Sequence, residues 1–246
     1  MKILFSPSEA KFKGGEDKKI SVDSFIFPEL FEKRKEAIDI YRKYVDISSE
    51  EELSKLFGTK KNDVIDYYKS DILDKELMKV IERYDGVAFD YLEYKELNDS
   101  EKKYIDNNVM IFSNLFGPVL AGDFGLPDYK LKQGEKLGEL ALEKFYNENF
   151  TDAIDTYLKD EEIIDLRAGF YEKFYKLKQP YVTMKFIKDG KVVSHWAKAY
   201  RGIILNLIAK NNINNISELM NMDIKNLSIE EIRKQKLKTE IIYSIK

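Results

Sequence analysis

The chain has 246 residues, 43% of them hydrophobic and 35% charged, with a formal net charge of −3, no cysteine and a single histidine, His195. This composition predicts a packed globular protein and excludes disulfides, thiol chemistry and most structural zinc sites. Because the protein is slightly acidic overall, it also excludes a uniformly basic nucleic-acid coat, so any contact with nucleic acid needs a local patch of cations.

The same inventory limits metals, cofactors and location. A transition-metal site would need carboxylate ligands alone, and no acidic pair shows ligand spacing, so we expect neither a metal nor another cofactor. No apolar run reaches the roughly 18 residues of a membrane span, and the N-terminus MKILFSPSEA lacks the apolar core of a signal peptide. We therefore expect a cytoplasmic protein without a membrane partner.

The first third of the chain combines a short apolar run with helical patterns. Residues 2–5 predict a buried strand, and the spacing of apolar residues over 28–45 predicts a helix. Ser49 and Glu52 form a capping box for a further helix that closes at Gly58.

Two more strands and several helices are predicted in the middle of the chain. Apolar runs at residues 86–92 and 109–113 have strand length, and a helical stretch at 99–107 separates them, as in a crossover unit of a partly parallel sheet. Further helices are predicted over residues 135–147 and 153–158.

The next region predicts a strand at residues 162–166 and then a β-hairpin. Alternating apolar residues from Tyr181 meet Asp189-Gly190, a dipeptide typical of type I′ turns. After the hairpin the apolar period changes to that of a helix.

The C-terminal region predicts a helix-hairpin-helix-like element. Asn-rich residues 211–215 separate two helices, and turns of this kind can grip a phosphate backbone through their N–H groups. Ser228 with Glu231 forms a capping box for another helix, and residues 239–245 predict a closing strand. Together these elements predict a mixed α/β (α+β) fold, a single compact domain over residues 1–246 with a central mixed sheet surrounded by helices.

Two cations lie where the hairpin is followed by the helix. Lys198 and Arg201 are three residues apart and share a face near the helix start, where unpaired N–H groups also favour an anion. Gly202 allows a ligand or another segment to approach the backbone closely. The alternative is a solvated helix face with Gly202 packed under the sheet.

Other polar residues add to these candidates. Lys130 and Lys132, two apart in an extended segment, point the same way. Asp165, at a strand end, is either a carboxylate that faces a site or a local cap. Glu9 is either a proton carrier or the partner of Lys11 in a salt bridge of an exposed loop.

These motifs, taken in order, resemble those of the YaaA family of bacterial peroxide stress proteins. The matching segments are ILFSPSEAK at the start, SNLFG at 113–117, PDYKLKQG at 127–134, IIDLRAGFYEKF around Asp165 and SHWAKAYRG at 194–202. The resemblance implies a mixed α/β fold with a positively charged cleft and a helix-hairpin-helix-like element. It also implies binding to DNA, with a preference for distorted duplexes, and a role in limiting damage from iron and hydrogen peroxide.

The leading hypothesis is a cytoplasmic DNA-binding protein of the hydrogen peroxide stress response, whose cations converge on one cleft. The residues expected to bind DNA or another anion are Lys11, Lys130, Lys132, Lys198 and Arg201. The residues expected to shape the cleft are Ser6, Pro7, Tyr129 and Gly202. The expected partner is duplex or distorted DNA.

The alternative hypothesis is an enzyme that acts on a nucleotide or nucleobase. Glu9 is then the acid or base, with Asp165 as a second catalytic candidate, while Lys198 and Arg201 hold the phosphate of a small nucleotide ligand. An open groove favours nucleic acid, whereas a deep closed pocket around Glu9 favours a small substrate.

Overall fold

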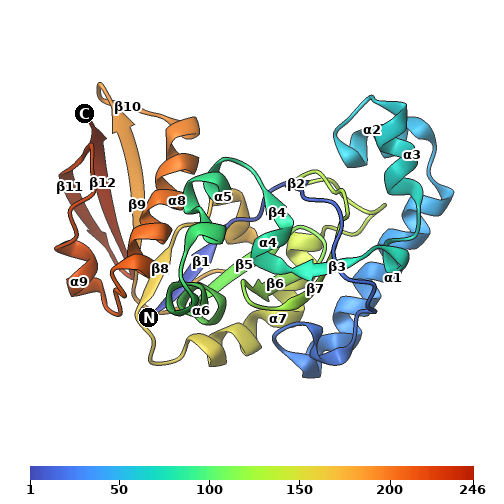
Figure 1. Cartoon of the computed structure of the whole chain (residues 1–246), viewed down its shortest axis with the longest axis horizontal. Helices are drawn as coiled ribbons and strands as arrows, with labels where there is room; N and C mark the ends of the chain where they lie inside the picture. Colours follow the sequence, from blue (N-terminus) through green and yellow to red (C-terminus); the bar gives the residue numbers. More distant parts are fainter.

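An eight-stranded mixed sheet forms the centre of the protein (Figure 1). The computed structural model describes the backbone of residues 1–246 and all side chains except those of Val192, Ser194 and His195. The strand order is β11-β12-β9-β8-β1-β5-β6, and β10 pairs with β9. The strands of this sheet are β1 (Lys2–Phe5), β5 (Val109–Ser113), β6 (Gly117–Leu120), β8 (Ile163–Asp165), β9 (Tyr181–Lys188), β10 (Lys191–Val192), β11 (Leu227–Gln235) and β12 (Lys238–Ile245).

Five neighbouring strands, β12, β9, β8, β1 and β5, run parallel to one another, whereas β6, β10 and β11 pair antiparallel. Two small antiparallel ribbons lie outside this sheet. They pair β2 (Ala10–Lys11) with β4 (Tyr84–Asp85), and β3 (Leu77–Lys79) with β7 (Phe124–Pro127). The parallel strands bring their carboxyl ends to one edge of the sheet, which is where open α/β sheets bind ligands.

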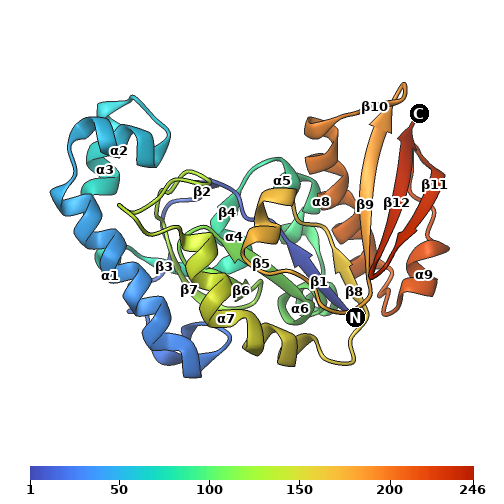
Figure 2. The same ribbon diagram turned by 180° about the vertical axis from the view of Figure 1, so that it is seen from behind.

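Helices cover both faces of the sheet and extend one end of the molecule. Figure 1 shows α5, α6 and α8 on the near face, and Figure 2, from behind, shows α7 on the other. Helices α1 to α3 project at the end opposite to β11 and β12. The α-helices are α1 (Phe31–Ile47), α2 (Glu50–Phe57), α3 (Asn62–Lys69), α4 (Val80–Arg83), α5 (Val87–Leu92), α6 (Asp99–Asn108), α7 (Leu142–Leu158), α8 (Ser194–Lys210) and α9 (Ile216–Met220). The 3-10 helices are η1 (Val22–Ser24), η2 (Pro28–Leu30), η3 (Ile72–Asp74), η4 (Tyr94–Glu96) and η5 (Gly169–Lys173).

The predicted mixed α/β fold with a central mixed sheet is confirmed, and several local predictions are confirmed with it. The Ser49 side chain accepts a hydrogen bond from the Glu52 backbone, and Gly58 ends α2 in the left-handed conformation. Asp189 and Gly190 have φ of 51° and 73°, as a type I′ turn requires at both central positions.

The crossover prediction is wrong in its first strand. Residues 87–92 form helix α5, and the parallel partner of β5 is β1. Phe89 and Leu92 are buried while Asp90 and Tyr91 between them are exposed, which is the period of a helix and not the alternation of a strand. The apolar run at this position is short, so its period alone did not separate helix from strand.

Two helix predictions in the second half of the chain are also corrected. Residues 228–235 belong to strand β11 and not to a helix, because this segment pairs along its length with β12. One continuous helix, α7, replaces the two predicted over 135–147 and 153–158. It begins only at Leu142, because Gly134 and Gly138, with φ of 81° and 62°, turn the preceding chain.

Within the part of the chain that the structure describes, none of the helices combines the length and apolar character needed to cross a membrane.

Candidate functional site

A cavity of about 420 Å³ lies beyond the carboxyl ends of β1 and β8. Strand β1 has β5 on one side and β8 on the other, so the chain order reverses here, as it does at the ligand sites of doubly wound sheets. Its walls come from the segment after β1, the start of α5, the segment after β8, one loop and α8. The lining residues are those at 5–9 and 86–89 together with Gln133, Leu166, Ala168, Tyr171, Lys198 and Arg201.

The cavity brings together five of the residues singled out in the sequence, from opposite ends of the chain. These are Ser6, Pro7, Glu9, Lys198 and Arg201. The sequence did not single out Gln133, Ala168 or Tyr171, since the order of the strands, which local patterns do not report, brings them to this edge.

Arg201 contributes a positive charge to the wall of the cavity. The residue is half-buried, and it forms no hydrogen bond or ion pair with any side chain that the structure describes. Burial lowers the pKa of Arg201 and the charge of Asp165 partly opposes this, but an arginine stays protonated at neutral pH. A guanidinium without a partner on a cavity wall favours binding of an anion.

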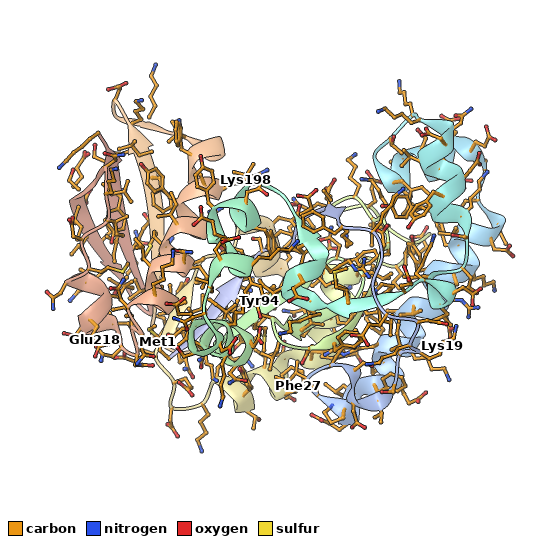
Figure 3. The ribbon with its side chains drawn as sticks, viewed as in Figure 1. Met1, Lys19, Phe27, Tyr94, Lys198 and Glu218 are labelled. Carbon is orange, nitrogen blue, oxygen red and sulfur yellow. The ribbon has the colours of Figure 1, made fainter. Side chains whose placement is uncertain are left out.

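Lys198 lies one helical turn before Arg201 on α8. Its side chain is exposed and, like that of Arg201, lacks an ion pair among the described side chains. Figure 3 shows Lys198 on α8 at the end of the helix next to α5. Because residues three apart on a helix share a face, the two cations can hold one anion together.

Gly202 is where α5 and α8 meet. A Cβ at this position would overlap the carbonyl oxygen of Ala88 and lie 3.1 Å from the amide nitrogen of Leu92. Of the two close approaches that the sequence allowed, a ligand or another segment, the structure therefore shows the second. The tight contact sets the distance between the two helices that form one side of the cavity.

Glu9 supplies the carboxylate of the cavity wall. Its Oε1 accepts a hydrogen bond from the backbone N–H of Gln133 at 2.9 Å, which ties the segment after β1 to the loop that follows β7. The alternative reading, a salt bridge to Lys11, is not formed, since the Lys11 ammonium lies 3.4 Å from the backbone oxygens of Ser8 and Glu9 instead. The Glu9 carboxylate therefore remains available to a ligand.

Ser6 joins the ends of the two central strands. Its Oγ accepts a hydrogen bond from the backbone N–H of Ala168 at 2.7 Å, which links β1 to the segment after β8. The hydroxyl proton is left for donation to a bound molecule.

Lys11 lies beside the cavity and not in its lining. Its ammonium stands over the ring of Tyr129, 3.9 Å from the centroid, and 5.4 Å from that of Tyr84. Desolvation lowers the pKa of this half-buried lysine to about 7, and the nearby charge of Asp128 only partly counteracts the effect. Because its pKa is lowered, Lys11 holds a positive charge less firmly near neutral pH and is a weaker phosphate contact than its sequence position suggests.

The remaining lysines of the predicted set are placed apart from the cavity lining. Lys130 is half-buried close to Lys11, and its backbone oxygen accepts a hydrogen bond from Tyr41. Lys132 is exposed and pairs with Glu135 at 3.1 Å. Tyr129 is buried, and its hydroxyl forms a hydrogen bond with Ser113 Oγ at 2.7 Å. This bond holds in place the ring over which the Lys11 ammonium lies.

Asp165 has a structural partner. Its two carboxylate oxygens accept hydrogen bonds from Arg167 Nε at 2.9 Å and Nη2 at 2.8 Å, and both residues are buried. Its Oδ1 also accepts the backbone N–H of Arg167. Asp165 therefore acts as a local cap for the segment that follows β8. Both of its carboxylate oxygens are already hydrogen-bonded to Arg167 and are not free to contact a substrate.

The turn between α8 and α9 lies at the other end of α8, about 18 Å from Lys198 for a rise of about 1.5 Å per residue. The two helices are joined as predicted by residues 211–215, and Asn212 adopts a positive φ of 47°. Glu218 occupies two donors of this turn, because its carboxylate accepts the backbone N–H of Asn214 and the side-chain amide of Asn215. The backbone N–H groups of residues 211–213 donate to carbonyl oxygens of α8. Figure 3 shows Glu218 well away from Lys198.

Among the side chains that the structure describes, no group of three or more histidine, cysteine, aspartate or glutamate residues is placed to hold a metal ion. The cavity accordingly offers two cations, one carboxylate, hydroxyl groups and a partly apolar wall.

Comparison with known proteins points to one family. A family described as "Peroxide stress protein YaaA" matches residues 1–233, which include every residue that lines the cavity. The Campylobacter jejuni protein Cj0984 is 49% identical over 245 residues, covering 100% of this chain and 99% of that protein. The UPF0246 protein FN1762 of Fusobacterium nucleatum is 30% identical over 242 residues, with 94% of each chain covered. The UPF0246 protein CE1889 of Corynebacterium efficiens is 32% identical over 219 residues, with 85% of each covered.

Proposed function

Because the chain belongs to the YaaA family of peroxide stress proteins, we propose that it acts in the hydrogen peroxide response as a cytoplasmic DNA-binding protein. In this proposal DNA phosphates bind at the end of α8 that carries Lys198 and Arg201. By binding to DNA, the protein would limit the damage that iron and hydrogen peroxide cause.

One observation carries this proposal, the guanidinium of Arg201 on the cavity wall without a partner among the described side chains. With 44 acidic against 41 basic residues, the chain as a whole does not attract DNA. Binding therefore depends on cations that are not neutralised locally, and Lys132, paired with Glu135, is a contrasting case. Lys198 and Arg201 meet this requirement from one helix face.

The test compares the salt dependence of DNA affinity in two double variants. Lys198→Ala with Arg201→Ala should weaken binding and reduce the slope of log affinity against log salt by about 1.8, since each phosphate contact contributes about 0.9. The control replaces Lys35 and Lys43 of α1 by Ala, because both are exposed, lack an ion pair among the described side chains and change the net charge equally. Equal slopes for the two double variants would show that the phosphates bind elsewhere.

The turn between α8 and α9 is a weaker candidate for a phosphate contact. Two of its donors already bind Glu218, others donate to backbone oxygens of α8, and the charge of the Glu218 carboxylate repels phosphate. We therefore place the main DNA contact at the cavity end of α8. Glu218→Gln should leave DNA affinity within about twofold, whereas a gain of tenfold or more would assign the turn to the interface.

A second function is favoured by the position of Glu9. The carboxylate lies in the wall of a cavity of about 420 Å³ that also contains Arg201, and this is the arrangement expected for an enzyme acting on a nucleotide or nucleobase. Mass spectrometry of mononucleotides incubated with the protein should then show a product that Glu9→Gln does not form. Absence of any product with the unaltered protein counts against this function.

A further inference from the structure

The cavity has the size and chemistry of a site for one nucleotide. Its volume of about 420 Å³ falls within the roughly 300–1,000 Å³ of small-molecule sites and is far too small for a duplex. Phe5, Phe89 and Tyr171, all buried, contribute to its walls. They make part of the wall apolar, as in most sites for small molecules.

The charges in the cavity favour one orientation of a bound nucleotide. Arg201 and Lys198 attract a phosphate to α8, and Lys198, being exposed, lies at the rim. Glu9, from the segment after β1, repels phosphate and accepts hydrogen bonds. These charges favour an orientation with the phosphate of a nucleotide at α8 and the donor groups of its base at Glu9.

The carboxylate also discriminates between bases. Guanine presents N1–H and its amino group as two adjacent donors, which match the two oxygens of a carboxylate. Adenine and cytosine present one amino group next to an acceptor that the carboxylate repels, and thymine presents one N–H between two carbonyl oxygens. The Gln133 amide holds Glu9 Oε1 in place at 2.9 Å, so the acceptor is oriented before a ligand binds.

We propose that this cavity binds a single unpaired nucleotide, with its phosphate on Arg201 and Lys198 and its base at Glu9, and that guanine is the preferred base. The proposal extends the proposed DNA-binding function, because an unpaired nucleotide of a DNA strand supplies the same chemistry as a free mononucleotide. Bases held outside the stack are commonly read in this way, through stacking and hydrogen bonds to the Watson–Crick edge.

The experiment measures Kd for a plain duplex and for the same duplex with one extra unpaired G, A, C or T. The readout is the ratio of the two Kd values within each variant, so that a general change in affinity cancels. Free dGMP and dAMP are titrated separately. Glu9→Gln tests the base contact, with Glu139→Gln as a control because Glu139 is exposed on the neighbouring loop and lacks an ion pair among the described side chains. Ala168→Leu fills the cavity, and thermal unfolding checks that each variant is folded.

We expect the duplex with an unpaired G to bind about tenfold more tightly than the plain duplex, and more tightly than those with the other bases. Glu9→Gln should remove the preference for G, Glu139→Gln should keep it, and folded Ala168→Leu should bind all duplexes alike. Equal affinity of the unaltered protein for plain and unpaired duplexes overturns the nucleotide site while leaving DNA binding intact. If dGMP binds in a Glu9-dependent way but no duplex binds, the nucleotide site is supported and the DNA-binding function fails. If neither binds, both are refuted.

Discussion

Replacing Gly202 by Ala tests whether the contact between α5 and α8 holds the cavity in shape. In an isolated helix this change stabilises by up to about 1 kcal/mol, because alanine has the higher helix propensity. Here the new methyl group would overlap the carbonyl oxygen of Ala88 and lie 3.0 Å from its carbonyl carbon. Both are backbone atoms, so no side-chain rotation relieves the overlap and the two helices must separate.

Overpacking of this kind costs about 1–3 kcal/mol, and it outweighs the gain in helix propensity. We expect a net destabilisation of about 1–2 kcal/mol, which lowers the Tm of a chain of this length by about 2–8 °C. Because Ala88 and Arg201 both line the cavity, the same change should weaken ligand or DNA binding. Differential scanning calorimetry and urea unfolding measure the first effect, and binding titrations the second.

Gly169 provides the matched control for this prediction. A Cβ at Gly169 would find its nearest neighbour, Glu172 Oε1, at 3.9 Å, and the residue does not have a left-handed φ. Gly169→Ala should therefore change the free energy of unfolding by less than about 0.5 kcal/mol. If Gly202→Ala is as stable as the parent protein, the two helices can separate without cost and the rigid-contact argument is wrong.

Two further predictions concern buried charges. Asp165→Asn should destabilise the protein by about 3–5 kcal/mol in urea unfolding, because it leaves the buried Arg167 guanidinium without its charged partner, and a loss below about 1 kcal/mol would contradict this. Lys11→Met should be more stable relative to the parent at pH 6 than at pH 9. The folded pKa of Lys11 is lowered from 10.5 to about 7, so the penalty for burying its charge is fully present below pH 7 and is lost as pH rises towards 10.5. Allowing for partial exposure and the loss of the contact with Tyr129, we expect a difference of about 1 kcal/mol between the two pH values, and no difference would refute the lowered pKa.

Elements specified by neighbouring residues were predictable from the sequence. The capping box at Ser49 and the Asp189-Gly190 turn each depend on hydrogen bonds or dihedral angles within a few residues, and both are found. Helix α5 was not predictable, because it is stabilised by α8, which follows about a hundred residues later in the chain. Strand β11 was missed although its partner β12 begins only three residues after it ends, because the Ser228–Glu231 pattern resembles a helix capping box. In both cases a short local pattern was compatible with either structure, and tertiary packing decided between them.

The site was predictable to a similar extent. Lys198 and Arg201 could be paired from their spacing, and the structure adds Glu9 and Ser6 to the same cavity. The environment of Lys11 was not predictable, because its lowered pKa results from burial over Tyr129, more than a hundred residues away in the chain. Charge can be counted from a sequence, but its desolvation depends on which segments meet.

Asp165 explains why Arg201 is left without a partner in a chain that has more acidic than basic residues. Burial lowers the pKa of Arg201, and the charge of Asp165 partly opposes this effect, so Asp165 is the acidic group whose field reaches this guanidinium. Both of its oxygens instead bind Arg167, which also donates to the backbone oxygens of Tyr171 and Tyr175 and so is fixed in place. The Asp165–Arg167 pair thus removes a competitor for Arg201 without reaching the cavity itself. Without Arg167 the Asp165 carboxylate would be unpaired, and its charge near Arg201 would weaken the attraction for an anion, so the structural ion pair favours the binding that we propose.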